Sequence, residues 1–256
     1  MAQIFEITSK NNDFYKNCVM LLKSAKSRRE QGLFIIEGER LLKDANIGGV
    51  EIESVVFSEE YFKKNGSNVD KDKVDKIYIF KNYLFEKIAD TVNSQGIIAL
   101  CKMNNGGSVI NKSGRYIALE NLQDPANVGA IARTAEALGI SGLIICGGVD
   151  VYSPKVLRAS MGTILRLPLF FADNIYSKGV ENGMRLIATV PDMNADTINK
   201  FEFENGDITI IGNEANGISA DTLCKCNCKV TIPMLGKAES LNAAAAAAIV
   251  MWEMIK

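Results

Sequence analysis

From Arg115 onward, short apolar runs alternate with segments whose apolar residues recur at helical spacing. Strands are predicted in RYIALE, GLIICG, ILRLPLFF, RLIATV, ITIIG and KVTIPM, and helices in VGAIARTAEAL, PKVLRASMG and SLNAAAAAAIVMWEMI. Nearly continuous apolar strands separated by helices are typical of a parallel sheet covered on both faces. This part of the chain is therefore predicted to be an α/β domain with a parallel sheet.

The region before residue 104 has a different pattern. Residues 4–32 are rich in Lys and Arg, and their spaced apolar residues predict a basic amphipathic helix. LFIIEGERLLKDA predicts a strand, a turn at Glu37-Gly38 and a helix, and further strands are predicted in VEIESVVFS, DKIYIF and GIIALCKM, with a helix in NYLFEKIADTV. The small, polar stretch that follows predicts a linker. We therefore predict a smaller α/β domain over residues 1–103, a linker over 104–113 and the larger domain over 114–256.

Composition and charge narrow the classes of function. The 256 residues are 47% hydrophobic and 23% charged, which excludes a disordered or fibrous chain. The chain has 29 Lys and Arg residues and 30 Asp and Glu residues, so its net charge is −1. Nucleic acid could therefore bind only through a local basic patch. The sequence has no histidine, which excludes a His general base, a Ser-His-Asp triad and any His-containing metal site.

The six cysteines favour a reduced structural role. Three of them alternate in CKCNC (224–228), a spacing that in a strand puts the thiols on one face, whereas structural zinc usually needs CxxC-like pairs and four ligands. The first residues lack the apolar core of a signal peptide, and no apolar run of about 18 residues occurs. We expect a cytoplasmic protein with reduced thiols, without a metal or a membrane partner.

Three segments place polar residues where a predicted strand ends. They are LENLQDPANVGAIARTAEALG (119–139), IIGNEANGIS (210–219) and VTIPMLGKAESLNAAAAAAIVMWE (230–253). Ligands of open α/β sheets bind at such strand ends, and glycine lets the backbone approach them closely. Taken singly, each segment has a structural alternative: Asp124, Asn127 or Ser240 as a helix cap, Arg133 as a solvated charge, and an ordinary Asn-Gly turn. A fourth segment, GGSVINKS (106–113), nearly matches a phosphate-binding loop. A strand rather than a helix follows it, which excludes that motif because the phosphates need a helix N-terminus.

Together, the order, spacing and wording of these segments resemble the SpoU-type RNA methyltransferases of the SPOUT class. The resemblance lies in ENLQDPANVGAIARTAEALG, GNEANGI and IPMLGKAESLN, with RASMG between the first and second, and covers about residues 114–256. SRREQGLFIIEGERLL and NSQGIIAL resemble the family's RNA-substrate-binding domain. This resemblance implies a parallel-sheet domain with a trefoil knot, preceded by a smaller α/β RNA-binding domain.

The resemblance also implies a reaction and a site. S-adenosylmethionine would be held by backbone and apolar groups at Gly212, Ile232, Met234 and Leu241. The matching polar positions, implied to be catalytic, are Asn127, Arg133, Glu214, Ser240 and Asn242. A guanidinium is effectively always protonated, so Arg133 suits stabilisation of a developing alkoxide and grip on a phosphate better than proton removal. Glu214 is the one motif carboxylate that could accept a proton, and it could alternatively engage the cofactor, or Asn127 across a dimer.

The sequence therefore predicts a homodimeric, cytoplasmic RNA 2′-O-ribose methyltransferase, with ribosomal RNA favoured over tRNA. RNA phosphates would contact a local basic cluster made of Lys10, Lys16, Lys23, Lys26, Arg28 and Arg29, for which a solvated helix face is the alternative. The alanine-rich C-terminal helix would suit a dimer surface. The competing hypothesis is a catalytically silent RNA-binding protein on the same fold. The presence of all the polar motif residues argues against it.

Overall fold

The structure is a computed structural model that describes residues 2–66, 74–91, 93–104, 110–177 and 183–256. The chain divides into two compact units. The N-terminal unit comprises residues 1–105 together with 152–158, and the C-terminal unit comprises 106–151 and 159–256. Residues 105–109 of the predicted linker lie outside the described residues, and the predicted boundaries at 103 and 114 stay a prediction. No helix among the described residues is long and apolar enough to cross a membrane.

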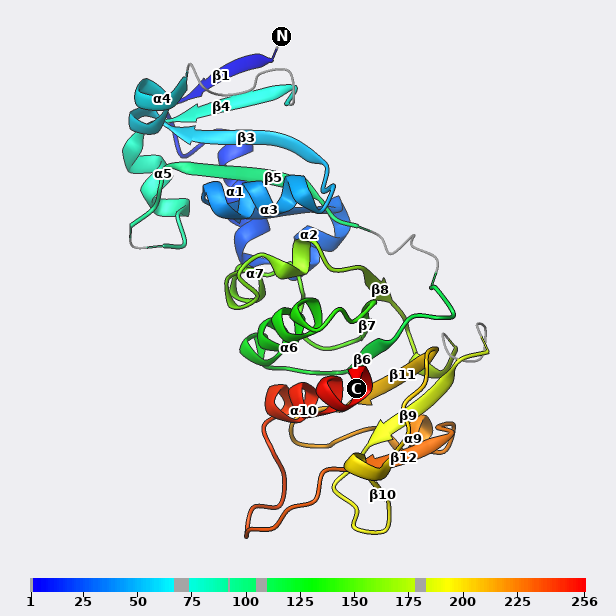
Figure 1. The fold of residues 1–256 in the computed structure, drawn as a ribbon. Helices are drawn as coiled ribbons and strands as arrows, with labels where there is room; N and C mark the ends of the chain where they lie inside the picture. Colours follow the sequence, from blue (N-terminus) through cyan, green and yellow to red (C-terminus); the bar gives the residue numbers. More distant parts are fainter. Residues whose placement is uncertain (1, 67–73, 92, 105–109, 178–182) are drawn as a thin grey trace. The chain divides into compact units, whose positions relative to one another are not determined.

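The N-terminal unit is built on a five-stranded mixed sheet with the order β1-β4-β3-β5-β2 (Figure 1). Its strands β1, β3 and β4 are parallel, whereas β5 runs antiparallel to β2 and β3. The elements are β1 (Gln3–Ile7), α1 (Asp13–Lys23), α2 (Ala25–Gln31), β2 (Leu33–Glu37), α3 (Glu39–Ile47), β3 (Ile52–Ser58), α4 (Glu59–Asn65), β4 (Lys76–Phe80), α5 (Asn82–Ile88) and β5 (Ile97–Lys102). The predicted turn after β2 is present, with Gly38 at φ +93°, a value that favours glycine.

The single basic helix predicted over residues 4–32 is wrong. Residues 3–7 form strand β1, which pairs with β4, and two helices follow. Asn12 caps α1, since its side-chain oxygen accepts from the backbone N–H of Phe14. Ser24 ends α1 in an extended conformation, and its hydroxyl accepts from the N–H of Ser27 to begin α2. The two caps therefore divide a segment whose apolar spacing alone suggested one continuous helix.

The C-terminal unit holds a seven-stranded sheet with the order β10-β12-β9-β11-β6-β7-β8, and every pairing in it is parallel. Its elements are β6 (Tyr116–Glu120), α6 (Pro125–Ala137), β7 (Gly142–Cys146), α7 (Pro154–Ala159), the 3₁₀ helix η2 (Thr163–Leu165), β8 (Leu169–Phe171), β9 (Arg185–Thr189), β10 (Asp196–Thr197), η3 (Ile198–Lys200), β11 (Asp207–Ile211), α9 (Ala220–Leu223), β12 (Cys228–Thr231) and α10 (Ala243–Ile255). Residues of α7 up to Arg158 group with the N-terminal unit. The predicted α/β fold with a parallel sheet is confirmed.

Alternate residues of the central strands face opposite sides of this sheet. Ala118, Ile144 and Ile210 belong to one core cluster, against which Leu223 of α9 packs. On the other face α6 and α10 pack against each other and lie side by side in Figure 1. Because both faces of the sheet are buried, most residues of these strands are apolar.

One local prediction in the C-terminal unit is wrong, and the spacing argument for CKCNC does not apply. The run ILRLPLFF is divided between η2 and the short strand β8, because the proline at position 168 supplies no N–H to a ladder. CKCNC does not lie in one strand: Cys224 ends α9 and β12 begins only at Cys228. The six cysteines are free, and the described residues contain no group of ligands that could hold a metal ion.

Candidate functional site

A cavity of about 460 Å³ opens at the carboxyl ends of β9, β11 and β12 and beside the first turn of α10. All four predicted cofactor-binding residues line it: Gly212, Ile232, Met234 and Leu241. Three of the predicted catalytic residues, Glu214, Ser240 and Asn242, line it as well. The parallel topology explains this arrangement, because the carboxyl ends of neighbouring strands meet at one edge of the sheet.

One wall of the cavity is a tight hairpin that follows β11. The backbones of Asn213 and Gly217 exchange two hydrogen bonds of 3.0 and 2.9 Å. The chain then passes directly over Gly212, where an added Cβ would lie 2.6 Å from the carbonyl oxygen of Gly217 and against the backbone N of Ile218. Gly217 itself has φ +66°. Only glycine at position 212 permits this close approach of two backbone segments.

A chain of side-chain hydrogen bonds joins the three segments that the sequence singled out. The Asn127 amide donates from Nδ2 to Glu214 Oε1 at 3.0 Å, and Asn242 donates from Nδ2 to Asn127 Oδ1 at 2.9 Å. The contact between Glu214 and Asn127 thus forms within one chain, and its predicted position across a dimer is wrong. Asn127 is 5% exposed, so both ends of its amide are used within the protein. The three residues therefore hold the β6–α6 loop, the hairpin after β11 and the start of α10 together at the cavity.

Glu214 also holds the beginning of α6. Its carboxylate accepts the backbone N–H groups of Gln123 at 3.0 Å and Asp124 at 3.1 Å. Burial acts to raise the pKa of Glu214, but the hydrogen bonds from Asn127 and from the backbone N–H groups outweigh it and lower the pKa below its ordinary value. The carboxylate is thus ionised at neutral pH and already saturated with donors, which suits a clamp and not a proton acceptor.

Helix α10 begins later than predicted. Its N-cap is Asn242, whose Oδ1 accepts from the N–H groups of Ala244 and Ala245 at 2.9 and 3.3 Å. Ser240 precedes the cap and is exposed at the cavity, so it is not the residue that begins the helix. At α6 the cap is Asp124, one of the two residues for which the sequence allowed this role.

Arg133 does not join the cluster around the cavity. It is exposed on α6, and within the described part of the chain it makes no ion pair. It lies on the same face of α6 as Gly129 and Glu136. Gly129 packs on the backbone of residues 159–160, and Glu136 pairs with Arg166 at 2.6 Å. The side chain is thus available to a binding partner outside this chain.

One wall of the cavity, formed by the last residue of β9 and by residues after it, was not predicted from the sequence. Thr189, Val190, Pro191 and Ile198 line the cavity, although RLIATV was identified only as a strand. The sequence did hold a signal for this wall: the residues after RLIATV follow the carboxyl end of a strand, and ligands bind at such ends in a parallel sheet. The strand order needed to place that end beside β11 and β12 is not readable from local pattern.

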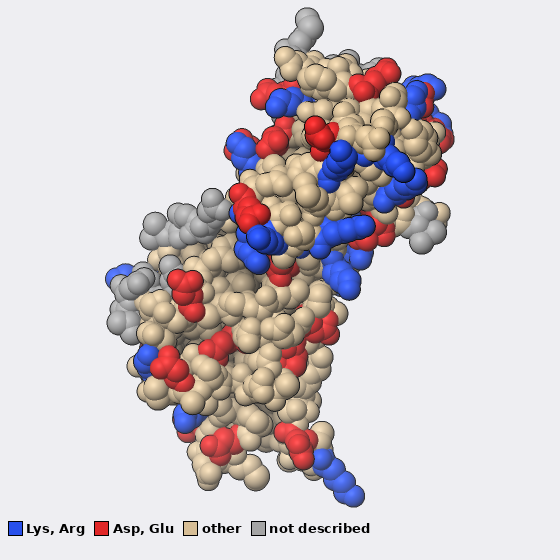
Figure 2. All heavy atoms as spheres, turned by 180° about the vertical axis from the view of Figure 1, so that it is seen from behind, with Lys and Arg blue, Asp and Glu red and all other residues tan. Residues whose placement is uncertain are grey.

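The predicted basic cluster needs one correction. Arg28 is buried, with 4% exposed, and its guanidinium donates to the carbonyl oxygens of Leu21 and Leu22 at the end of α1. It therefore stabilises the helix pair and is not part of a binding surface. Lys16 and Lys26 lie near Asp13 and Glu30, at 3.5 and 3.7 Å, and are exposed. On the face shown in Figure 2, Lys and Arg side chains gather over the N-terminal unit.

Comparisons with known proteins are consistent with this geometry. Residues 114–252 match the model of the SpoU rRNA Methylase family, and residues 12–99 match the MRM3-like substrate binding domain. An uncharacterized tRNA/rRNA methyltransferase of Synechocystis sp. is 34% identical over 98% of this chain and 94% of its own. The 23S rRNA guanosine 2′-O-methyltransferase RlmP of Bacillus subtilis is 28% identical over 91% of this chain and 92% of its own. The structure of the SpoU methyltransferase AviRb from Streptomyces viridochromogenes with AdoMet is 26% identical, covers 95% of this chain and 98% of that chain, and has a TM-score of 0.81.

Proposed function

Since the chain belongs to the SpoU rRNA methylase family, we propose that it methylates a ribose 2′-hydroxyl of ribosomal RNA in preference to tRNA. The protein is an RNA 2′-O-ribose methyltransferase that depends on S-adenosylmethionine. The observation that carries the methyl-transfer activity is the hydrogen-bond chain Glu214–Asn127–Asn242, because it assembles all three motif segments around one cavity. The preference for ribosomal RNA is supported by relatives that are named as 23S rRNA 2′-O-methyltransferases.

The cavity fits the cofactor. Its volume of about 460 Å³ lies within the range of small-molecule sites, and its walls are mostly apolar. None of the described residues that line it is Lys or Arg, so a sulfonium cation would meet no like charge there. Gly212 brings backbone within reach of a ligand. When bound, S-adenosylmethionine supplies an electrophilic methyl group whose leaving group is a neutral thioether.

In this proposal the residues of the chain divide the remaining tasks. Gly212, Ile232, Met234 and Leu241 hold the cofactor, and Ser240 positions the ribose at the mouth of the cavity. Asn127, Glu214 and Asn242 keep the three loops in register so that the hydroxyl and the methyl group are aligned.

Arg133 grips the adjacent phosphate and stabilises the alkoxide that develops on the ribose oxygen. A cation with a planar fork of donors suits both tasks, and the exposed position on α6 leaves it open to RNA. This role requires the RNA, or a second copy of the chain, to bring the reacting ribose to Arg133.

The proposal includes a homodimer and a division of labour between the units. Helix α10 leaves Ile249 and Trp252 exposed, at 38% and 53%, which favours a second copy packing on this face. The N-terminal unit would bind the RNA through its exposed Lys10, Lys23 and Arg29. The predicted trefoil knot remains part of the proposal. A cytoplasmic location agrees with six free thiols.

Incubation with radiolabelled S-adenosylmethionine and separated RNA pools tests this function. We expect label in ribosomal RNA, at a nucleotide that resists alkaline hydrolysis because its 2′-oxygen is methylated, and much less in tRNA. Label found mainly in tRNA would refute the preference. RNA binding without any methyl transfer would establish the catalytically silent alternative.

A further inference from the structure

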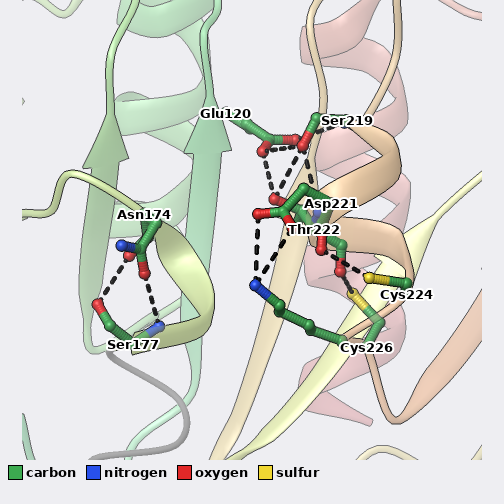
Figure 3. A network of polar contacts seen from close by, with 9 residues as sticks. Glu120, Asn174, Ser177, Ser219, Asp221, Thr222, Cys224 and Cys226 are labelled. Atoms are coloured by element: carbon green, nitrogen blue, oxygen red, sulfur yellow. Dashed lines mark hydrogen bonds and ion pairs between the residues drawn. The ribbon is translucent and has the colours of Figure 1, made fainter.

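Glu120, the last residue of β6, lies outside the set of residues that line the cavity. Its carboxylate accepts three hydrogen bonds from the other end of the segment that follows β11. Oε2 accepts the backbone N–H of Ser219 at 2.9 Å, and Oε1 accepts the hydroxyls of Ser219, at 2.9 Å, and Thr222 (Figure 3).

These donors fix the start of α9. Ser219 is the N-cap of that helix, and its hydroxyl also accepts the N–H of Thr222 at 3.2 Å. Thr222 is 3% exposed. Because Glu120 bonds both the cap residue and a buried side chain of the first turn, it ties α9 to the end of a central strand.

The position of Ser219 sets the position of the cavity wall. Ser219 directly follows Gly217 and Ile218, the two residues whose backbone crosses Gly212, and both Gly212 and Gly217 line the cavity. The hairpin is therefore anchored to the segment after β6 through Asn213, which donates from Nδ2 to the carbonyl oxygen of Asn121, and through Glu214, which accepts backbone N–H groups before α6. Glu120 anchors the residues just beyond the hairpin. Loss of the Glu120 carboxylate would remove the anchor at Ser219, the residue that follows the hairpin.

We propose that Glu120 is a positioning residue for cofactor binding, which acts through Ser219 and Thr222 on the part of the cavity wall formed by Gly212 and Gly217. The inference rests on the proposed function only in taking S-adenosylmethionine as the occupant of the cavity. Because Glu120 does not line the cavity, its loss should change how well the cofactor binds and should not change the reaction once the cofactor is bound.

The test is calorimetric titration with S-adenosylmethionine, together with methylation rates at saturating cofactor and RNA. The variants are Glu120→Ala, Glu120→Gln and Thr222→Val, in the full-length protein. Glu204→Ala is the matched control, since that carboxylate belongs to the same unit, pairs with Arg185 at 3.0 Å and does not line the cavity.

We expect Glu120→Ala to weaken cofactor affinity about tenfold, the size expected when hydrogen bonds to a charged group are lost, with kcat within about twofold. Glu120→Gln should largely rescue affinity, because an amide oxygen can accept from the Ser219 N–H while the amide N–H groups donate to the hydroxyls. Thr222→Val, which removes one donor of three, should weaken affinity about two- to threefold. Glu204→Ala should match the wild type.

Unchanged affinity in Glu120→Ala, even with a lower melting temperature, would overturn the proposal and leave Glu120 as a stabilising residue only. A fall in kcat with unchanged affinity would overturn it as well, and so would equal losses in Glu120→Ala and Glu120→Gln. Where Glu120→Ala does not fold, wild-type affinity in Thr222→Val refutes the idea. Failure of the wild-type protein to bind the cofactor would instead refute the proposed function, and the same titration reveals it.

Discussion

Replacement of Asn127 by Asp should reverse the pH dependence of the stability of the C-terminal unit. In the wild-type protein the Asn127 amide donates to Glu214 Oε1 at 3.0 Å, and Asn127 is buried. Asn127→Asp puts a second carboxylate at that distance. Two like charges 3.0 Å apart repel by about 1 kcal/mol in water and by about 5 kcal/mol at an effective dielectric constant of 20, and one hydrogen bond is lost in addition.

The direction of the pH effect follows from the pKa values. Because the pKa of Glu214 lies below its ordinary value in the wild type, the stability from this group is present at neutral pH and is lost as the pH falls through the lowered pKa. In Asn127→Asp the facing carboxylates raise one pKa of the pair, since a shared proton removes the repulsion. The variant should therefore be closest to wild type in acid and lose stability as the pH rises through that raised pKa.

Urea unfolding followed by tryptophan fluorescence measures this effect. The sole tryptophan, Trp252, lies in α10 and thus reports on the C-terminal unit. Asn127→Ala is the control: it loses both hydrogen bonds and should cost about 2–4 kcal/mol with little dependence on pH between 5 and 8. If Asn127→Asp loses stability in parallel with Asn127→Ala across this range, the Asn127–Glu214 contact does not have the geometry described.

Further predictions concern the cavity, Arg133 and the basic cluster. Gly212→Ala should lose about 1–3 kcal/mol of stability and most cofactor binding in calorimetric titration, because its Cβ meets the backbone of the hairpin; normal binding would contradict the close approach. Arg133→Ala should reduce the single-turnover rate on the cognate RNA about 10²-fold with unchanged cofactor affinity, and Arg133→Lys should rescue little; a near-normal rate would make it a solvated charge. Arg28→Ala should destabilise the N-terminal unit by about 2–4 kcal/mol in thermal unfolding, since two carbonyl oxygens lose a charged donor. Arg29→Ala should change stability by less than about 0.5 kcal/mol and weaken RNA binding in filter assays; the opposite ranking of Arg28 and Arg29 would be incompatible with the structure.

The parts of the fold with strong local signals could be predicted from the sequence. Asp124 and Pro125 are respectively a favoured cap residue and a favoured first helical residue, and α6 begins there. Gly38 marks the turn between β2 and α3 because the chain needs a positive φ at that point. The parallel sheet followed from apolar runs without polar alternation, since both faces are covered.

Local pattern failed where the outcome depended on distant residues. In the sequence, Arg28 is indistinguishable from the surface cations of the basic stretch around it. Only the packing of α2 against α1 shows that it donates a hydrogen bond to the end of α1. Ser240 and Asn242 are both acceptable caps, and the contact with Asn127 distinguishes them, because it holds Asn242 at the helix start. The cavity wall after β9 depends on strand order, which no local periodicity encodes.

The hydrogen-bond chain at the cavity has a consequence for the order in which the protein is made. Asn127 is separated by 87 residues from Glu214 and by 115 from Asn242, and these two partners are synthesised after it. At about 5–20 residues per second, a nascent chain spends several seconds with α6 complete and its partners not yet made. During that interval Asn127 has no acceptor or donor from either later segment, and the carboxyl end of β11 has no partner in α10. Cofactor affinity should therefore arise abruptly, when Asn242 emerges from the ribosome, and ribosome-bound chains arrested before that residue should retain no labelled S-adenosylmethionine.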